Sequence, residues 1–188
     1  MCCMTTRVTK IKALAAALLF CAAFGVSAPA QEADPTTVER GMRVYQSETA
    51  DCKTCHGWNG TGRFNDHQYV SEVDGIGPSL ATSTMDRAAM IEVISCGRIT
   101  TTHNTMMPQF RGDAWTASYP CGGKTKADLA EGEKPLQAQY TLPPAIIEAL
   151  VTYIQEVYQG KSMSWEWCSK YFKDYERICE VWRDHGAQ

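Results

Sequence analysis

The pentapeptide Cys52-Lys53-Thr54-Cys55-His56 constrains this chain more than any other feature of its sequence. Its pattern, C-x-x-C-H, is the attachment signature of a c-type haem. Two thiols three positions apart on one helical turn can each form a thioether with one of the two vinyl groups of a porphyrin, and the adjacent imidazole then faces the iron. The motif therefore predicts one covalent haem c, attached through Cys52 and Cys55, with His56 as an axial ligand of the iron.

Three other kinds of site also use closely spaced cysteines. A thioredoxin-like motif is expected near a βαβ pattern, and no strand-like run lies beside residues 52–56. A structural zinc site needs four ligands, but the sequence has no second C-x-x-C and no paired histidines. A disulfide between Cys52 and Cys55 would close a very small, strained loop. Haem attachment is therefore the interpretation that the sequence favours.

The N-terminus predicts export from the cytoplasm. A basic start precedes an uninterrupted apolar run, Ala13 to Val26, whose 14 residues are fewer than the ~20 that a membrane-spanning helix needs. The small residues Ala28-Pro29-Ala30 follow, as a signal peptidase requires. We expect residues 1–30 to be a cleaved signal peptide, with an uncleaved anchor as the alternative. No other stretch of the chain is apolar enough to span a membrane, which predicts a periplasmic protein without a transmembrane segment.

Removal of this peptide changes the charge of the chain. The whole sequence has 18 Lys and Arg against 21 Asp and Glu, a net charge of −3. Residues 1–30 hold three of the basic residues and no acidic one, so the mature chain has a net charge of −6. An acidic chain with 44% hydrophobic residues is neither a basic nucleic-acid binder nor a disordered protein.

Six cysteines remain in the mature chain, and four of them lie outside the haem motif. An oxidising compartment favours their pairing as disulfides, and three connectivities are possible. Because the members of each pair are close in the sequence, we expect Cys96–Cys121 and Cys168–Cys179.

The pattern of the C-terminal tail conflicts with the second of these pairs. Helical spacings of 3 and 4 separate Trp165, Cys168, Phe172, Tyr175, Cys179 and Trp182. In an unbroken helix, the Cα atoms of Cys168 and Cys179 would be ~16 Å apart, whereas a disulfide allows at most ~7 Å. We therefore expect the helix to break near Lys173-Asp174. The alternative is that the two cysteines each pair elsewhere.

Hydrophobic periodicity predicts three further helices and an all-α fold. The first spans about residues 34–45 and begins at Asp34-Pro35, and the second spans about residues 85–95. The third begins at Pro143-Pro144, continues to Tyr158 and stops at Gly160. Its expected buried stripe is Ile147, Leu150, Val151, Ile154 and Val157. The residues that it should turn to water are Glu148, Thr152, Gln155 and Glu156.

The tripeptide Met106-Met107-Pro108 offers a second axial ligand for the iron. A thioether ligand favours ferrous iron and raises the reduction potential. Met107, Met106 and His103 all lie close enough in the sequence to compete for this position. An open distal site is a further alternative.

The order of three motifs resembles that of the class I, single-haem cytochromes c. These motifs are C-x-x-C-H-G at residues 52–57, Gly77-Pro78-Ser79-Leu80, and the Met-Pro pair at residues 107–108. The resemblance implies a cytochrome c-like helical domain around the haem, with Met107 as the distal ligand. It also implies that the Pro78 carbonyl accepts the Nδ1 proton of His56, which would orient the imidazole and raise its basicity. Arg98 is a candidate for the haem propionates, in a loop that flanks Met107. The alternatives are Trp115, Trp58 and Tyr119.

The same resemblance divides the chain into domains. Residues 31–160 would form the cytochrome c domain, in which Gly41 and Tyr45 resemble the small and aromatic pair at the crossing of the family's first and last helices. An insert at about residues 111–142 departs from a minimal member of the family. Residues 161–188 would form an aromatic, disulfide-linked, helical extension that braces the domain.

The resemblance implies a periplasmic electron carrier that is not an enzyme, because iron held by His56 and Met107 has no open coordination position. Its partners would be redox proteins, a dehydrogenase donor or an oxidase acceptor, and the acidic charge predicts a basic docking surface on them. The insert and the tail resemble those of acceptor cytochromes of exported quinoprotein dehydrogenases. The alternatives are a haem subunit of a larger dehydrogenase or oxidase complex, and a haem enzyme or sensor with an open distal site.

Overall fold

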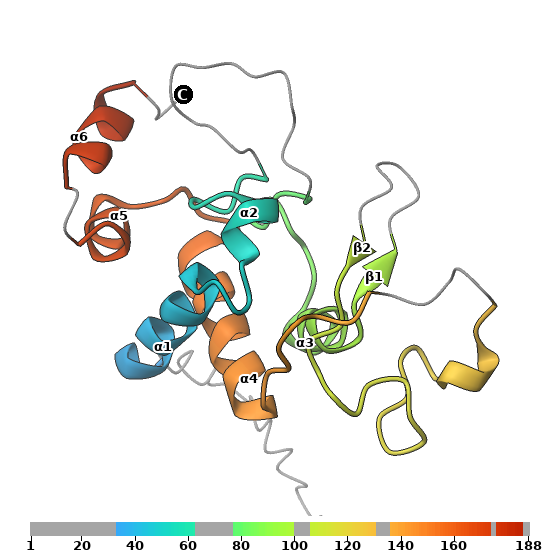
Figure 1. Cartoon of the computed structure of the whole chain (residues 1–188). Helices are drawn as coiled ribbons and strands as arrows, with labels where there is room; N and C mark the ends of the chain where they lie inside the picture. The colour runs from blue at the N-terminus through green and yellow to red at the C-terminus, as the bar shows by residue number, and fades with distance from the viewer. Residues whose placement is uncertain (1–32, 63–76, 100–105, 131–135, 174–175, 186–188) are drawn as a thin grey trace, which may run out of the picture. The chain divides into compact units, whose positions relative to one another are not determined.

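The computed structural model describes residues 33–62, 77–99, 106–130, 136–173 and 176–185 (Figure 1). The expected signal peptide and His103 lie outside these residues. Within the described ranges, no helix combines the length and the apolar composition needed to traverse a bilayer.

The described chain is helical, as expected. Its elements are α1 (Pro35–Gln46), α2 (Cys52–His56), α3 (Arg87–Cys96), β1 (Arg98–Ile99), β2 (Met106–Met107), the 3₁₀ turn η1 (Lys126–Asp128), α4 (Pro144–Tyr153), the π-helical turn η2 (Ile154–Tyr158), α5 (Trp165–Tyr171) and α6 (Glu176–His185). β1 and β2 form a short antiparallel ladder in which Arg98 is opposite Met107. This two-residue ladder is a small departure from a purely helical fold.

Aspartate side chains begin two of the helices. The carboxylate of Asp34 accepts the N–H groups of Thr36 and Thr37 at 3.4 and 3.1 Å at the start of α1. That of Asp86 accepts the N–H of Ala89 at 2.8 Å at the start of α3. Each carboxylate satisfies amide groups that have no partner within the helix. Both helices begin and end within two residues of the expected positions.

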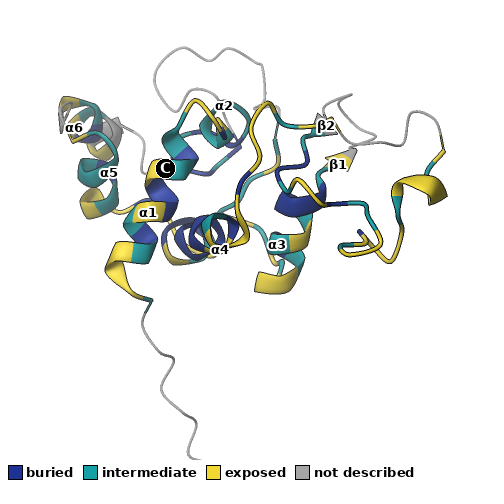
Figure 2. Cartoon of the chain, turned by 60° about the horizontal axis from the view of Figure 1, so that its bottom comes forward, coloured by how far each residue is buried: buried dark blue, intermediate teal, exposed yellow. Residues whose placement is uncertain are grey.

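The core lies where α1 crosses α4, and the buried residues gather on these helices (Figure 2). Gly41 lies at the crossing. A Cβ atom there would collide with the carbonyl oxygen of Ala149 and lie 2.6 Å from Cβ of Tyr153. Tyr45, one turn later, is fully buried, and its ring meets that of Tyr153 with centroids 5.6 Å apart. A small and an aromatic residue therefore set the approach of the two helices.

We expect Gly41→Ala to lower the free energy of unfolding by about 2 kcal/mol. Overpacking a well-packed core costs about 1–3 kcal/mol, occasionally more, and this cost exceeds the gain of up to about 1 kcal/mol in helix propensity. Urea denaturation of the haem-loaded protein measures the change. Arg43→Ala, on the exposed face of α1, is the control and should leave the stability nearly unchanged. A Gly41→Ala protein as stable as the wild type would contradict the close crossing.

The last helix differs from the expected one at its C-terminal end. It is α-helical only to Tyr153, after which Ile154–Tyr158 forms a π-helical turn. In this wider turn, the N–H of Gln159 donates to the carbonyl of Ile154 at 2.9 Å. The turn keeps Tyr158 fully buried, with its hydroxyl 2.6 Å from the carbonyl of Trp58. The change from α-helix to π-helix therefore comes with the contact between Tyr158 and Trp58.

Thr152 is a second correction to the expected helix. The periodicity predicts that Thr152 faces water, but it is buried. Its hydroxyl donates to the carbonyl of Glu148 at 2.9 Å and accepts from the guanidinium of Arg87 at 3.1 Å. Arg87 belongs to α3, so the packing of α3 against α4 buries the polar side chain of Thr152.

Both expected disulfides are present. Cys96–Cys121 joins the end of α3 to the insert, and Cys168–Cys179 joins α5 to α6. The tail helix breaks after Tyr171, because Phe172 leaves the helical conformation with φ −107° and ψ 48°. This break brings the Cα atoms of Cys168 and Cys179 to 5.7 Å, which confirms the prediction that the tail is two short helices.

Candidate functional site

A cavity of about 380 Å³ lies beside α2, and α3, α4 and β2 also contribute to its wall. Its volume falls within the range of roughly 300–1,000 Å³ that is usual for small-molecule and cofactor sites. Cys52, Cys55 and His56 line it, and so does Met107. The apolar part of the wall includes Leu80, Met85, Met90, Val93, Ile94, Phe110, Leu150 and Ile154. The structure therefore brings the C-x-x-C-H motif and the expected distal methionine to one mainly apolar cavity.

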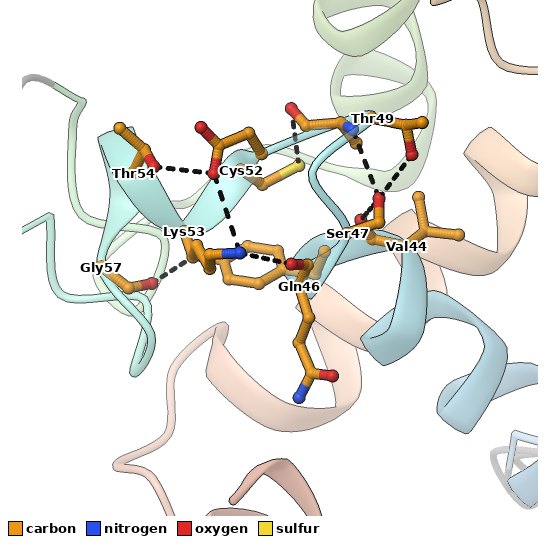
Figure 3. A network of polar contacts seen from close by, with 11 residues as sticks. Val44, Gln46, Ser47, Thr49, Cys52, Lys53, Thr54 and Gly57 are labelled. Atoms are coloured by element: carbon orange, nitrogen blue, oxygen red, sulfur yellow. Dashed lines mark hydrogen bonds and ion pairs between the residues drawn. The ribbon is translucent and has the colours of Figure 1, made fainter.

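A network of polar contacts holds the turn that leads into α2 (Figure 3). The ammonium group of Lys53 donates to the carbonyl of Gln46 at the end of α1. The hydroxyl of Thr54 donates to the carboxylate of Asp51 at 2.7 Å. Asp51 has φ 46° and ψ 41°, a left-handed conformation that Asp adopts more readily than most residues. These contacts fix the turn immediately before Cys52.

The two cysteines of α2 are half-buried and are not joined by a disulfide. Desolvation raises the pKa of the Cys52 thiol to about 12, and the nearby charge of Asp51 acts in the same direction. Desolvation also raises the pKa of Cys55. Both groups are therefore neutral thiols at pH 7, in a cavity wall where each is available for thioether formation.

His56 is buried and has a defined hydrogen bond on one ring nitrogen. Its Nδ1 donates to the carbonyl of Pro78 at 2.8 Å. Desolvation lowers the pKa of His56, which favours the neutral ring. With the proton on Nδ1, the lone pair of Nε2 is free to bind a metal.

Gly77 allows the loop that carries Pro78 to approach the histidine so closely. A Cβ atom at Gly77 would lie 2.9 Å from Nδ1 and from Cε1 of His56, and 2.9 Å from the carbonyl oxygen of Cys55. The N–H of Gly77 also donates to that carbonyl at 2.8 Å. The loop is therefore joined to α2 by main-chain and side-chain hydrogen bonds, and a larger residue would displace the imidazole.

Among the candidate distal residues, Met107 is the one that the structure describes at the cavity. Met107 and Pro108 line the wall and are half-buried. Arg98, opposite Met107 in the ladder, also lines the cavity and is exposed. The side chain of Met106 and the whole of His103 lie outside the described residues.

Three tyrosines support the site through hydrogen bonds that the sequence pattern does not predict. The hydroxyl of Tyr45 donates to the carbonyl of Gly57, and that of Tyr158 to the carbonyl of Trp58, each at 2.6 Å. Tyr153 and Tyr158 are also hydrogen-bonded, with their hydroxyl oxygens 2.7 Å apart. Residues five apart do not share a face of an α-helix, so only the π-helical turn makes these two neighbours. The cluster anchors the chain directly after the C-x-x-C-H motif.

We expect Tyr158→Phe to lower the free energy of unfolding by about 1–3 kcal/mol, because the part-buried carbonyl of Trp58 and the buried hydroxyl of Tyr153 would each lose the hydrogen bond to the Tyr158 hydroxyl. Denaturant unfolding of the haem-loaded protein measures the loss. Tyr140→Phe removes the same atom from a side chain that is 49% exposed, and it should have little effect. Equal stabilities of the two variants would refute an anchoring role of the Tyr158 hydroxyl.

A comparison with protein families decides what kind of domain surrounds this cavity. The family model described as cytochrome c oxidase, cbb3-type, subunit III matches residues 36–119. The match includes the C-x-x-C-H motif, the segment around Pro78, and Met107. The chain contains a c-type cytochrome domain. No curated protein and no solved structure matches the chain significantly.

A c-type cytochrome domain implies covalently bound haem c and haem-based electron transfer. The residues of the cavity fit this cofactor: two unpaired thiols, an imidazole whose Nε2 is free, a thioether and a mainly apolar wall. The family match ends at residue 119. The cytochrome therefore has α4, the end of the insert and the C-terminal extension beyond the matched range.

Proposed function

We propose that this cytochrome is a periplasmic electron carrier with one covalent haem, ligated by His56 and Met107, and that it exchanges single electrons with redox partner proteins. The observation that carries the proposal is the shared cavity, which the C-x-x-C-H residues and Met107 line together. Residues 1–30 would direct the chain to the periplasm and then be removed.

The haem motif, Met107 and the apolar wall of the cavity each have a role in this proposal. Cys52 and Cys55 hold the macrocycle by thioether bonds, and the hydrogen bond from Nδ1 to Pro78 keeps His56 in the tautomer that can ligate iron. The haem supplies the reversible one-electron change between ferric and ferrous iron. Met107 favours the ferrous form, and the apolar wall excludes water, which also affects the potential. With both axial positions filled by side chains, the protein would transfer electrons rather than catalyse a reaction at the metal.

The net charge supports a basic docking surface on the partner. After loss of residues 1–30 the chain has a net charge of −6, and complementary charge accelerates the association of electron-transfer partners in a salt-dependent way. The donor would be a dehydrogenase, with exported quinoprotein dehydrogenases as one class, and the acceptor would be an oxidase.

A second candidate function is a haem subunit that stays bound in an oxidase complex. The matching family is described as a subunit of a cbb3-type cytochrome c oxidase. Leu136, Tyr140 and Trp165 are large apolar side chains that are 59%, 49% and 40% exposed, and such residues could be covered in an assembly. A stable monomer in size-exclusion chromatography favours the free carrier, and co-purification with membrane-bound oxidase subunits favours the complex.

Absorption spectra of the haem-loaded protein in both oxidation states test the proposed ligation. We expect the pyridine haemochrome of a haem with two thioether bonds, and the weak far-red sulfur-to-iron band in the ferric spectrum. Carbon monoxide should bind slowly to the ferrous protein, because Met107 occupies the distal position. A ferric spectrum without the band, together with rapid carbon monoxide binding, would instead identify an enzyme or sensor with an open distal site.

A further inference from the structure

We propose that residues 136–138, which we call the strap, position the Met107 loop at the haem cavity through their hydrogen bonds to Gln109. The strap is the returning part of the insert and lies beyond the range matched by the cytochrome family. The inference rests on the proposed function, because it assigns a positioning role with respect to Met107 as distal ligand.

Main-chain hydrogen bonds join the strap to the residue two positions after Met107. The N–H of Gln109 donates to the carbonyl of Leu136 at 2.8 Å, and the N–H of Ala138 donates to the carbonyl of Gln109 at 3.1 Å. Gln109 and Gln137 thus form a parallel bridge. Gln109 is only 3% exposed, so its main-chain groups depend on protein partners rather than on bulk water.

The two glutamine side chains strengthen this bridge. The amide nitrogen of Gln109 donates to the amide oxygen of Gln137, and the amide nitrogen of Gln137 donates to the carbonyl of Gln109 at 3.3 Å. Gln137 is exposed. It can therefore be changed without opening the core, although its partner is buried.

The chain is also fixed on the far side of Gln109. The N–H of Phe110 donates to the carbonyl of Ile94 at 3.1 Å, and the N–H of Leu142 donates to the carbonyl of Phe110 at 2.7 Å. Phe110 itself lines the cavity. On the near side, Met107 is paired with Arg98 in the short ladder. The strap thus holds Gln109, which lies between Met107 and Phe110, two residues of the cavity wall.

A loop that opens locally exposes its site for a fraction of the time, and that fraction sets the apparent affinity of an external ligand. Loss of strap hydrogen bonds should raise the open fraction of the Met107 loop. An external ligand of ferric iron would then compete more successfully with the Met107 thioether. This competition distinguishes positioning of the loop from general stability of the fold.

The experiment titrates the ferric, haem-loaded protein with imidazole and follows the loss of the sulfur-to-iron band. Gln137→Ala removes both side-chain hydrogen bonds of the bridge and should raise the apparent imidazole affinity by at least about fivefold, the effect of one typical hydrogen bond. Ala138→Pro removes the N–H that donates to Gln109, and it should raise the affinity at least as much. The control is Gln46→Ala, which removes the side-chain amide that donates to the carbonyl of Tyr171 in α5 at 3.0 Å. It keeps the main-chain carbonyl that accepts from Lys53, and it should not change imidazole binding.

Three other results would contradict the proposed role of the strap. In the first, the wild type shows the band but neither Gln137→Ala nor Ala138→Pro changes the imidazole affinity by more than about twofold. This result would refute the positioning role of the strap and leave the assignment of Met107 as ligand unaffected. If Gln46→Ala raises the affinity as much as Gln137→Ala, the effect reflects general stability. If the wild type has no sulfur-to-iron band, Met107 is not the distal ligand, and the proposed positioning role of the strap is refuted as well.

Discussion

Replacement of Cys52 and Cys55 together by serine is expected to abolish covalent haem attachment completely. A thioether forms between a thiol and a vinyl group of the porphyrin, and a hydroxyl group is not a substitute for the thiol. Both thiols are unpaired and line the cavity, so their removal leaves His56 and Met107 as the only proposed bonds to the cofactor. Intact-protein mass spectrometry under denaturing conditions should show the mass of the polypeptide without haem.

The second pair of cysteines provides the matched control. Cys168→Ser with Cys179→Ser also removes two sulfur atoms, but these form a disulfide between α5 and α6. That variant should retain covalent haem and lose about 2–4 kcal/mol of stability. Haem that stays attached to the Cys52 and Cys55 variant through denaturation would refute the assigned attachment site.

Met107→Ala is expected to remove the far-red band from the ferric spectrum and to lower the reduction potential. The thioether favours ferrous iron, and axial ligands set haem potentials over a range of roughly 0.8 V, so we expect a fall on the order of 100 mV or more. Carbon monoxide should also bind the ferrous variant faster than the wild type. Spectroelectrochemical titration measures the potential.

The control for this variant is Met163→Ala. Met163 is 6% exposed in the core cluster and does not line the cavity. Its loss should cost about 2–5 kcal/mol of stability and leave the sulfur-to-iron band in place. A band that persists in Met107→Ala would assign the ligand to Met106. A wild-type spectrum of bis-histidine ligation would instead assign it to His103.

Features that depend on residues close in the sequence were predicted well. Asp34-Pro35 predicted the start of α1, where the Asp34 carboxylate bonds to amides within the next turn. Periodicity predicted α3 to within two residues of its observed bounds. The Cys168–Cys179 pair and the periodicity of the tail together predicted a break in that helix, since the length of an unbroken helix is incompatible with the span of a disulfide.

Other features were not predictable from such patterns. Tyr158 reaches the carbonyl of Trp58, 100 positions earlier in the chain, and the π-helical turn that makes this possible has no signature in the apolar periodicity. Thr152 is buried because α3 packs over it and Arg87 bonds its hydroxyl. The polarity of a threonine side chain predicts that it is exposed to water, but its burial depends on which elements pack against it.

The sequence by itself determined the cofactor chemistry and the helical class of this protein. Two thiols and an imidazole within five residues, with no strand-like run beside them and no second C-x-x-C in the sequence, indicate haem attachment. The periodicity and the helix caps likewise depend on residues within single turns. Only the tertiary structure decided how the site is assembled. The side chain of Gln137 meets that of Gln109, 28 residues earlier in the chain, and the hydroxyl of Tyr158 meets the carbonyl of Trp58, 100 residues earlier. Such contacts form because packing of the core brings distant segments together and buries polar groups that then require partners.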